Sequence, residues 1–186
     1  MTPSRILTIV SAIWVLSEIA LGIARRRTAA QAESRDRSSI TLLWITITIS
    51  VFAASYLTRV EATQMPREAF WIGIAVLIAG TLLRWIAIYT LRRFFTVVVT
   101  IRADHDVIDH GVYRFIRHPA YTGSLLQFLG LGIAFCNWLS VAAMLLGTGA
   151  AFAYRIRVEE RALVEALGEK YRAYMTRTKR LIPGVF

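Results

Sequence analysis

The sequence predicts an all-α polytopic membrane protein, and three observations support this fold class. Hydrophobic residues make up 56% of the 186 positions, above the roughly 45–50% that is usual in soluble domains. The mean hydropathy is +0.52. Long uncharged runs alternate with short segments in which the basic residues gather. We therefore expect five transmembrane helices, including a tight C-terminal helical hairpin, and an additional interfacial C-terminal helix.

The N-terminal region, residues 1–91, is predicted to contain three of these helices. The runs 6–24, 40–57 and 70–91 each approach the roughly 20 residues that cross a bilayer. The first connection carries five arginines, whereas the second carries few basic residues. By the positive-inside rule, the first connection is cytoplasmic and the N-terminus lies outside. This region is a possible route of substrate access.

Two charged residues, Glu18 and Arg84, interrupt the apolar runs. Charges inside a spanning helix are costly and often functional. Glu18 lies close enough to the helix end to reach the interface, or it pairs with an arginine. Arg84 either extends its guanidinium to the headgroups or points into a polar cavity, where it would orient an anionic substrate or a cofactor carboxylate. The sequence leaves both alternatives open.

The second region, residues 92–186, is predicted to bind the cofactor and to carry the catalytic groups. Residues 92–117 do not span, and we expect extended structure with a short hairpin near 94–101. Residues 120–154 contain no charged side chain. As one helix they would rise about 50 Å, well beyond the roughly 30 Å hydrocarbon core.

The uncharged run must therefore fold back, and Cys136-Asn137-Trp138 at its midpoint is a suitable turn. The hairpin 120–154 would return the chain to the membrane face that it left. An interfacial amphipathic helix is then expected over 155–177. This path brings Glu159 and Glu160 to the same face as Arg117 and His118.

Composition narrows the classes of partner and site. The net charge of +10 comes from basic residues clustered between apolar runs, an arrangement typical of contact with anionic headgroups and not of nucleic-acid binding. Cys136 is the single cysteine, so no intramolecular disulfide can form. The three histidines lack metal-ligand spacing, and no metal site is expected. Oligomeric state leaves no mark in the sequence.

The polar and aromatic residues that could take part in catalysis are gathered in one ordered motif. Residues 111–123 read Gly-x-Tyr-x-x-x-Arg-His-Pro-x-Tyr-x-Gly. Asp104-His105 precede the motif, and the acidic pair Glu159-Glu160 follows the uncharged run. Further downstream come Leu167, Gly168, Tyr171, Tyr174, Arg180, Ile182 and Pro183. This set, from about Arg84 to the end, resembles the signature of the isoprenylcysteine carboxyl methyltransferase family. Related phospholipid methyltransferases carry a similar pattern.

The resemblance implies methyl transfer from S-adenosyl-L-methionine to a lipophilic acceptor at the cytoplasmic membrane face. The expected acceptor is the α-carboxylate of an isoprenylcysteine-like substrate, either a small molecule or a prenylated protein, reached among membrane lipids. The catalytic residues implied are Arg117, His118 and Glu160. Arg84 and Arg155 are implied in substrate binding. The cofactor-binding residues implied are His105, Val107, Gly111, Tyr113, His118, Pro119, Tyr121, Glu159 and Glu160.

Two positions depart from the family pattern. Val112 stands where proline is common, and Arg92-Arg93 replace a frequent Leu-Gly. The second change affects the lip of the expected cofactor site. The first two apolar runs carry no recognisable family signature, and substrate specificity is expected there.

The acceptor is the least constrained part of the hypothesis. A carboxylate is already an anion at neutral pH, whereas an amine or thiol acceptor needs a general base or a lowered pKa. The scarcity of candidate bases favours a carboxylate. The alternatives are a phospholipid or small-lipophile methyltransferase acting on nitrogen, sulfur or oxygen, a nicotinamide-dependent membrane reductase, and a non-catalytic membrane scaffold.

Overall fold

The computed structural model describes residues 2–29, 37–91 and 107–184, and the regular structure within them is helical. Three helices are long and apolar enough to cross a membrane among the described residues, namely Pro3–Leu21, Ala69–Leu91 and Trp138–Leu167. The expected hairpin near 94–101 and His105 fall outside the described residues. The long helices are α1 (Pro3–Ala29), α2 (Arg37–Leu57), α3 (Ala69–Leu91), α4 (Pro119–Ala134) and α5 (Trp138–Leu167), followed by α6 (Glu169–Arg177).

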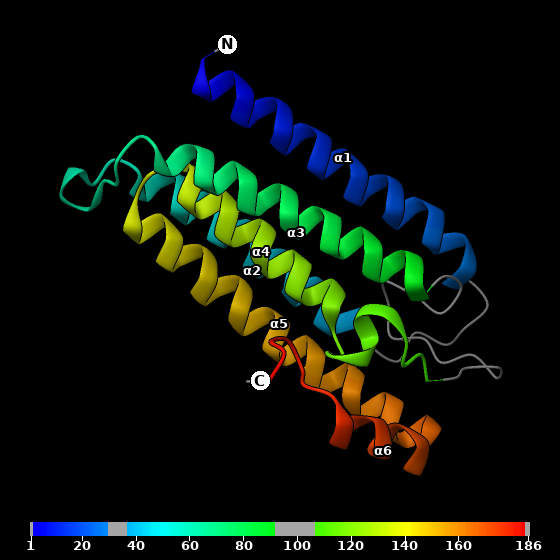
Figure 1. Ribbon diagram of the computed structural model, residues 1–186. Coiled ribbons are helices and arrows are strands. Elements are labelled where there is room, and N and C mark those ends of the chain that lie inside the picture. The colour runs from blue at the N-terminus through cyan, green and yellow to red at the C-terminus, as the bar shows by residue number, and fades with distance from the viewer. Residues whose placement is uncertain (1, 30–36, 92–106, 185–186) are drawn as a thin grey trace.

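The helices lie roughly along one direction and pack in a defined order (Figure 1). α3 packs against α4, α4 against α5 and α5 against α2, while α1 touches α3 from the outside. Among the described side chains of α1, only Leu21 is buried. The first helix is therefore a peripheral element.

The tightest interface lies between α3 and α4, where glycines face one another. A Cβ placed on Gly80 would lie 2.6 Å from the Gly123 carbonyl oxygen, and one on Gly123 would lie 2.7 Å from the Arg84 amide nitrogen. Gly73 and Gly130 repeat this arrangement further along the same two helices. Small residues allow such close backbone approach between helices in a membrane. This interface holds Arg84 against the start of α4.

Replacing Gly123 with alanine is expected to destabilise the fold by about 1–3 kcal/mol, the usual cost of overpacking. The added methyl group would push against backbone atoms that cannot rotate away. Gly149 is the matched control, because a Cβ there meets nothing within 4 Å. Gly149→Ala should be neutral or stabilising by up to about 1 kcal/mol. Thermal unfolding in one detergent compares the two, and equal midpoints for Gly123→Ala and the unchanged protein would contradict the interface.

The connection between α4 and α5 depends on Asn137. Its side-chain oxygen accepts a hydrogen bond from the Ser140 amide at 3.1 Å and so caps α5. Its side-chain nitrogen donates to the Val60 carbonyl at 3.1 Å and to Thr63 Oγ1 at 2.9 Å. Asn137 is fully buried, so this turn is tied to the α2–α3 connection.

The expected helix boundary at 154–155 is wrong. α5 continues without a break to Leu167, and the chain changes direction only at Gly168, where φ is +54°. Arginine and glutamate are good helix formers, and charge alone does not end a helix. Glycine in a left-handed conformation does. At 1.5 Å per residue α5 is about 45 Å long, so its charged C-terminal part extends past a hydrocarbon core of roughly 30 Å.

Candidate active site

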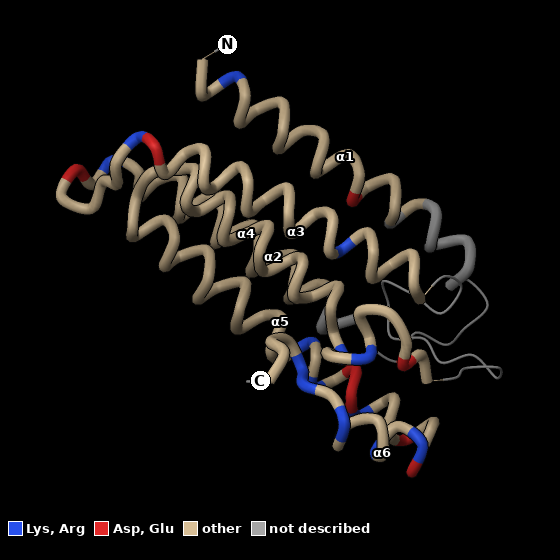
Figure 2. Tube along the Cα trace, viewed as in Figure 1, with Lys and Arg blue, Asp and Glu red and all other residues tan. Residues whose placement is uncertain are grey.

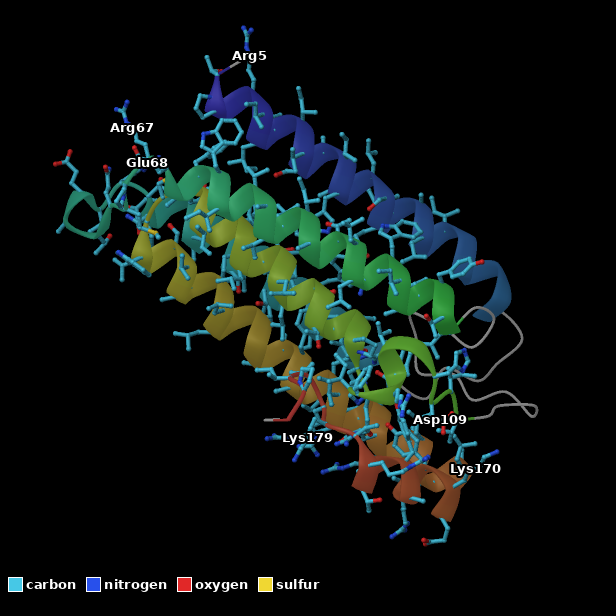
Figure 3. The ribbon with its side chains drawn as sticks, in the orientation of Figure 1. Arg5, Arg67, Glu68, Asp109, Lys170 and Lys179 are labelled. Carbon is cyan, nitrogen blue, oxygen red and sulfur yellow. The ribbon has the colours of Figure 1, made fainter. Side chains whose placement is uncertain are left out.

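The predicted motif lies at the end of the bundle where α4 begins and α5 carries its charged residues. Asp109, Lys170 and Lys179 mark this end, whereas Arg67 and Glu68 mark the opposite one (Figure 3). A short 3-10 turn, η3 (Gly111–Arg114), leads into the segment before α4. Pro119 opens α4 at its first turn, as proline can because its missing N–H would be unpaired there.

A C-terminal segment runs beside the motif and fixes its backbone. The Arg117 amide donates to the Lys179 carbonyl at 2.7 Å, and the His118 amide donates to the Arg180 carbonyl at 3.0 Å. The Lys179 amide donates in return to the Phe115 carbonyl at 3.2 Å. Two of the three residues expected to be catalytic, Arg117 and His118, are therefore held at their backbone by residues more than sixty positions later along the chain.

Glu160 is the centre of the polar cluster. Its side chain is buried, and one carboxylate oxygen accepts a hydrogen bond from Arg117 Nε at 3.0 Å. The other oxygen accepts one from Arg180 Nε, also at 3.0 Å. His118 Nε2 lies 3.3 Å from the first oxygen, and because a carboxylate only accepts, this nitrogen must carry the proton. Glu160, Arg117 and His118, the expected catalytic set, thus lie in direct contact.

A second set of contacts joins α4 to α5 beside this cluster. The Tyr121 hydroxyl donates to Glu159 Oε2 at 2.8 Å, and Arg155, which is 2% exposed, interacts with the same hydroxyl. The Tyr121 ring centroid lies 5.7 Å from that of His118. Glu159 and Glu160 are adjacent in sequence but belong to different sets of contacts.

Buried tyrosines form the side of the site nearest α6. The Tyr174 hydroxyl donates to the Tyr113 carbonyl at 2.7 Å, and the Tyr171 and Tyr174 rings lie 5.8 Å apart. Burial raises the pKa of the Tyr113, Tyr171 and Tyr174 hydroxyls well above the ordinary value. These groups are therefore neutral at physiological pH and act as hydrogen-bonding and packing groups.

The two remaining expected cofactor residues in the described chain, Val107 and Gly111, lie at the approach to η3. Gly111 adopts a left-handed φ of +59° beside Thr90 of α3, a conformation that favours glycine. Val107 is half-buried at the start of this segment. The centre of the cluster comes instead from the residues just before α4, from Glu160 of α5 and from Arg180 of the C-terminal segment.

Arg84 lies deeper in the bundle, apart from the Glu160 cluster. Arg84 belongs to α3, on which Figure 2 shows a basic position in an otherwise uncharged helix, as it shows an acidic position on α1. Its Nε and one terminal nitrogen donate to the two Glu18 oxygens at 2.6 and 2.8 Å. The other terminal nitrogen donates to Ser124 Oγ at 2.9 Å. The pairing of Glu18 with an arginine is confirmed, and Arg84 points into the bundle instead of extending to the headgroups.

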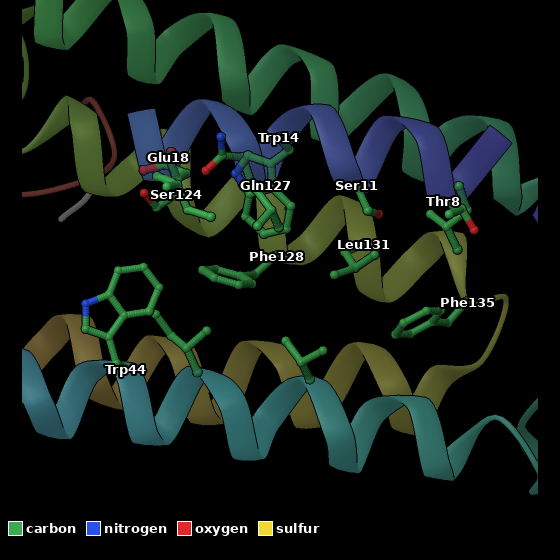
Figure 4. A pocket seen from close by; sticks show the side chains of 15 residues that line it. Thr8, Ser11, Trp14, Glu18, Trp44, Ser124, Gln127, Phe128, Leu131 and Phe135 are labelled. Carbon is green, nitrogen blue, oxygen red and sulfur yellow. The ribbon is translucent and has the colours of Figure 1, made fainter. Parts of the chain in front are cut away.

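An apolar groove runs from this ion pair along α4, with α1 and α2 as its walls (Figure 4). Its volume is about 570 Å³. Glu18 and Ser124 lie at one end, and Thr8 and Phe135 at the other. The floor consists of Ser124, Gln127, Phe128 and Leu131 of α4 and of Phe135, which follows the helix.

Sequence reasoning missed two parts of this arrangement. Ser124 carries no sequence signal, because a serine in an apolar helix commonly bonds its own backbone. Arg180 does carry a sequence signal, since it belongs to the downstream part of the motif. The motif does not predict, however, that Arg180 contacts Glu160. The groove was expected only as sideways access between unspecified helices.

Comparison with known proteins identifies the family. The model of the isoprenylcysteine carboxyl methyltransferase (ICMT) family matches residues 71–165, slightly more than half of the chain. The chain belongs to the ICMT family. This match contains η3, α4 and nearly all of α3 and α5, and therefore Arg84, Arg117, His118 and Glu160.

Curated relatives agree with this assignment. A probable protein-S-isoprenylcysteine O-methyltransferase of Oryza sativa subsp. indica is 36% identical over 130 residues, which cover 66% of this chain and 68% of the rice protein. Protein-S-isoprenylcysteine O-methyltransferase A of Arabidopsis thaliana is 33% identical over 135 residues, covering 70% and 68%. The yeast enzyme, from Saccharomyces cerevisiae, is 32% identical over 114 residues, covering 60% and 48%.

A solved structure also matches, that of the eukaryotic intramembrane Ras methyltransferase ICMT. The TM-score is 0.62 at 25% identity, and the match covers 89% of this chain but 63% of that one. The ICMT fold and the relatives make this chain an integral membrane methyltransferase. Membership of the ICMT family rules against the nicotinamide-dependent reductase and the non-catalytic scaffold.

Proposed function

We propose that this ICMT-family chain transfers a methyl group from S-adenosyl-L-methionine to the α-carboxylate of an isoprenylcysteine-like acceptor. One observation carries the proposal: the buried cluster of Arg117, His118 and Glu160 forms where α4 begins, and an apolar groove starts at Glu18 and Ser124, within about two turns along the same helix. A polar reacting group and an apolar tail can thus be held together. The relatives, which are named as protein-S-isoprenylcysteine O-methyltransferases, support this acceptor class.

The membrane arrangement is part of the proposal. Five helices, α1 to α5, would cross the bilayer with the N-terminus outside. The catalytic end would face the cytoplasm, where the water-soluble methyl donor is found. Support comes from the basic residues of the first connection and of the motif, which favour a cytoplasmic position by the positive-inside rule.

The chemistry of the polar residues fits S-adenosylmethionine, which presents a carboxylate, an ammonium group and an adenosine. Glu160 already accepts hydrogen bonds from two arginines and His118, which leaves little of its accepting capacity. We therefore assign Glu160 to holding Arg117 and His118 in position. Glu159, which accepts a hydrogen bond from the Tyr121 hydroxyl, is assigned to the donor ammonium or ribose hydroxyls. Residues proposed to enclose the adenosine are His105, Val107, Gly111, Tyr113, Pro119 and Tyr121.

The reaction places modest demands on the protein. Bound S-adenosylmethionine supplies an electrophilic methyl group, and an acceptor carboxylate is already a nucleophilic anion, so no general base is required. The residues must align the acceptor and exclude water. Arg84, with Ser124 at the groove end, and the buried Arg155 are proposed to orient the acceptor carboxylate. For Arg84, this means exchanging one carboxylate partner, Glu18, for another.

A methyl-label transfer assay tests the function. Purified protein in lipid is given labelled S-adenosylmethionine with N-acetyl-S-farnesylcysteine or phosphatidylethanolamine. We expect label in the farnesylcysteine product that alkali releases as methanol, which identifies an ester. His118→Ala, which removes a proposed catalytic group, should abolish this label. Base-stable label in the lipid instead would favour the phospholipid N-methyltransferase alternative.

A further inference from the structure

Besides the apolar groove, the bundle has a second cavity at the end away from the catalytic cluster. Its volume is about 550 Å³. The first turns of α1, the start of α3 and the turn between α4 and α5 line it together. Figure 3 labels two of its residues, Arg67 and Glu68, at the end of the bundle opposite to the residues that mark the catalytic end. The second cavity is therefore separate from the Glu160 cluster.

The walls of the second cavity are apolar. Phe70 and Ala134 are buried and belong to one small apolar cluster, against which Leu7 and Cys136 pack. Leu7 and Phe135 line both this cavity and the apolar groove. A water-soluble molecule would gain little from such walls, whereas the glycerol and chain region of a lipid would bury apolar surface against them.

The rim of the second cavity carries opposite charges. Arg67 and Glu68 are consecutive and exposed, and within the described part of the chain they are the charged residues of the lining. Burial and the nearby Glu68 carboxylate raise the pKa of the Cys136 thiol. The thiol is therefore uncharged at physiological pH, and the negative charge of Glu68 lies beside the cavity. The site offers one cation and one anion above apolar walls.

The rim lies at the depth of lipid headgroups. α3 begins at Ala69, directly after the charged pair, and is long and apolar enough to cross a membrane. Trp71 in its first turn is 57% exposed, and tryptophan is enriched at the membrane–water interface. A zwitterionic headgroup carries a phosphate for Arg67 and, two carbons away, an ammonium group for Glu68. An anionic headgroup would meet Glu68 with a charge of the same sign.

We infer that the second cavity binds one zwitterionic glycerophospholipid, with its phosphate at Arg67, its ammonium group at Glu68 and its glycerol region against the apolar walls. α1 is the peripheral helix, and Leu7 is among the residues by which it packs on the bundle at this end. A lipid in this position fills the space between α1 and α3 and fastens the first helix. The inference is independent of the proposed methyl transfer, because the cavity lies at the other end of the bundle.

Native mass spectrometry of the detergent-solubilised protein tests the site with two lipids that share oleoyl chains, phosphatidylcholine and phosphatidylglycerol. Phosphatidylcholine has a quaternary ammonium group and accepts no further methyl group, so its binding cannot be confused with that of a methyl acceptor. We expect one bound phosphatidylcholine, with an affinity about two- to fivefold above that of phosphatidylglycerol, the range that exposed ion pairs contribute. Glycerophosphocholine, the headgroup without chains, should not displace it, and displacement would overturn the assignment to a lipid.

Glu68→Lys is the most informative variant, because it gives the rim two cations. The preference should reverse, so that phosphatidylglycerol binds about two- to fivefold more tightly than phosphatidylcholine. Glu61→Lys is the matched control, since it makes the same charge change at an exposed residue of the same connection outside the lining, and it should keep the original preference. Equal binding of both lipids by the unchanged protein, or the same shift in both variants, would overturn the site. Either result would leave the proposed function to the methyl-label assay.

Discussion

Replacing Glu160 with alanine is expected to abolish binding of S-adenosylmethionine in a calorimetric titration. The substitution removes the acceptor of hydrogen bonds from Arg117, His118 and Arg180. Arg117 is 8% exposed at its side chain, so its charge would lose its compensating partner in a buried position. Breaking a buried ion pair by removing one partner typically costs about 3–5 kcal/mol. The cluster should therefore rearrange as a whole.

Two further variants distinguish loss of the Glu160 charge from a general loss of folding. Glu160→Gln keeps the shape but removes the charge, and it should weaken binding strongly while allowing the protein to fold. Glu169→Ala removes a carboxylate that is 91% exposed and pairs with Arg172 on the surface of α6, and it should leave binding and the thermal midpoint unchanged. Donor affinity equal to that of the unchanged protein in Glu160→Ala would end the assignment of this cluster to the donor site.

Removing Glu18 is expected to cause the second large effect, this time on stability. Glu18→Ala leaves Arg84 inside the bundle without its bidentate partner, with its side chain 14% exposed. We expect a loss of about 3–5 kcal/mol of unfolding free energy, because an uncompensated cation within a membrane bundle is costly. Thermal unfolding in detergent should show a clearly lowered midpoint.

The double substitution Glu18→Leu with Arg84→Leu tests whether the loss of stability comes from the uncompensated charge of Arg84. Since both ionic groups are then replaced by apolar ones, stability should return close to that of the unchanged protein. Glu61→Ala, at an exposed carboxylate in η1 (Glu61–Thr63), is the matched control and should change little. A single Glu18→Ala variant as stable as the control would mean that the ion pair contributes nothing to the fold.

Local chemistry explains why parts of the structure were predictable. The helical membrane character follows from long uncharged runs, which leave the backbone few ways to satisfy its polar groups except as helix. The expected ends of the third run agree with α3 to within one residue. The break near Cys136-Asn137 followed from the length of the uncharged run, and Asn137 does cap α5. The error at 154–155 arose because a change from apolar to charged residues was taken as a helix end.

The candidate site, too, was predictable from the sequence only in part. The ordered motif was sufficient to name Arg117, His118 and Glu160 as partners, and the structure brings them into contact. The motif did not distinguish Glu159 from Glu160, because adjacent residues on a helix point in different directions. The different partners, Tyr121 for one and Arg117, His118 and Arg180 for the other, appear only once α4, α5 and the C-terminal segment are packed.

By itself, the sequence determined that this chain is a helical membrane protein with an ICMT-type motif and two charges in its apolar runs, because composition, period and motif order are local properties. Only the tertiary structure decided that those two charges neutralise each other and that α1 and α2 form the walls of an apolar groove along α4. Such contacts join residues distant in sequence, and they depend on how closely the glycines let α3 approach α4.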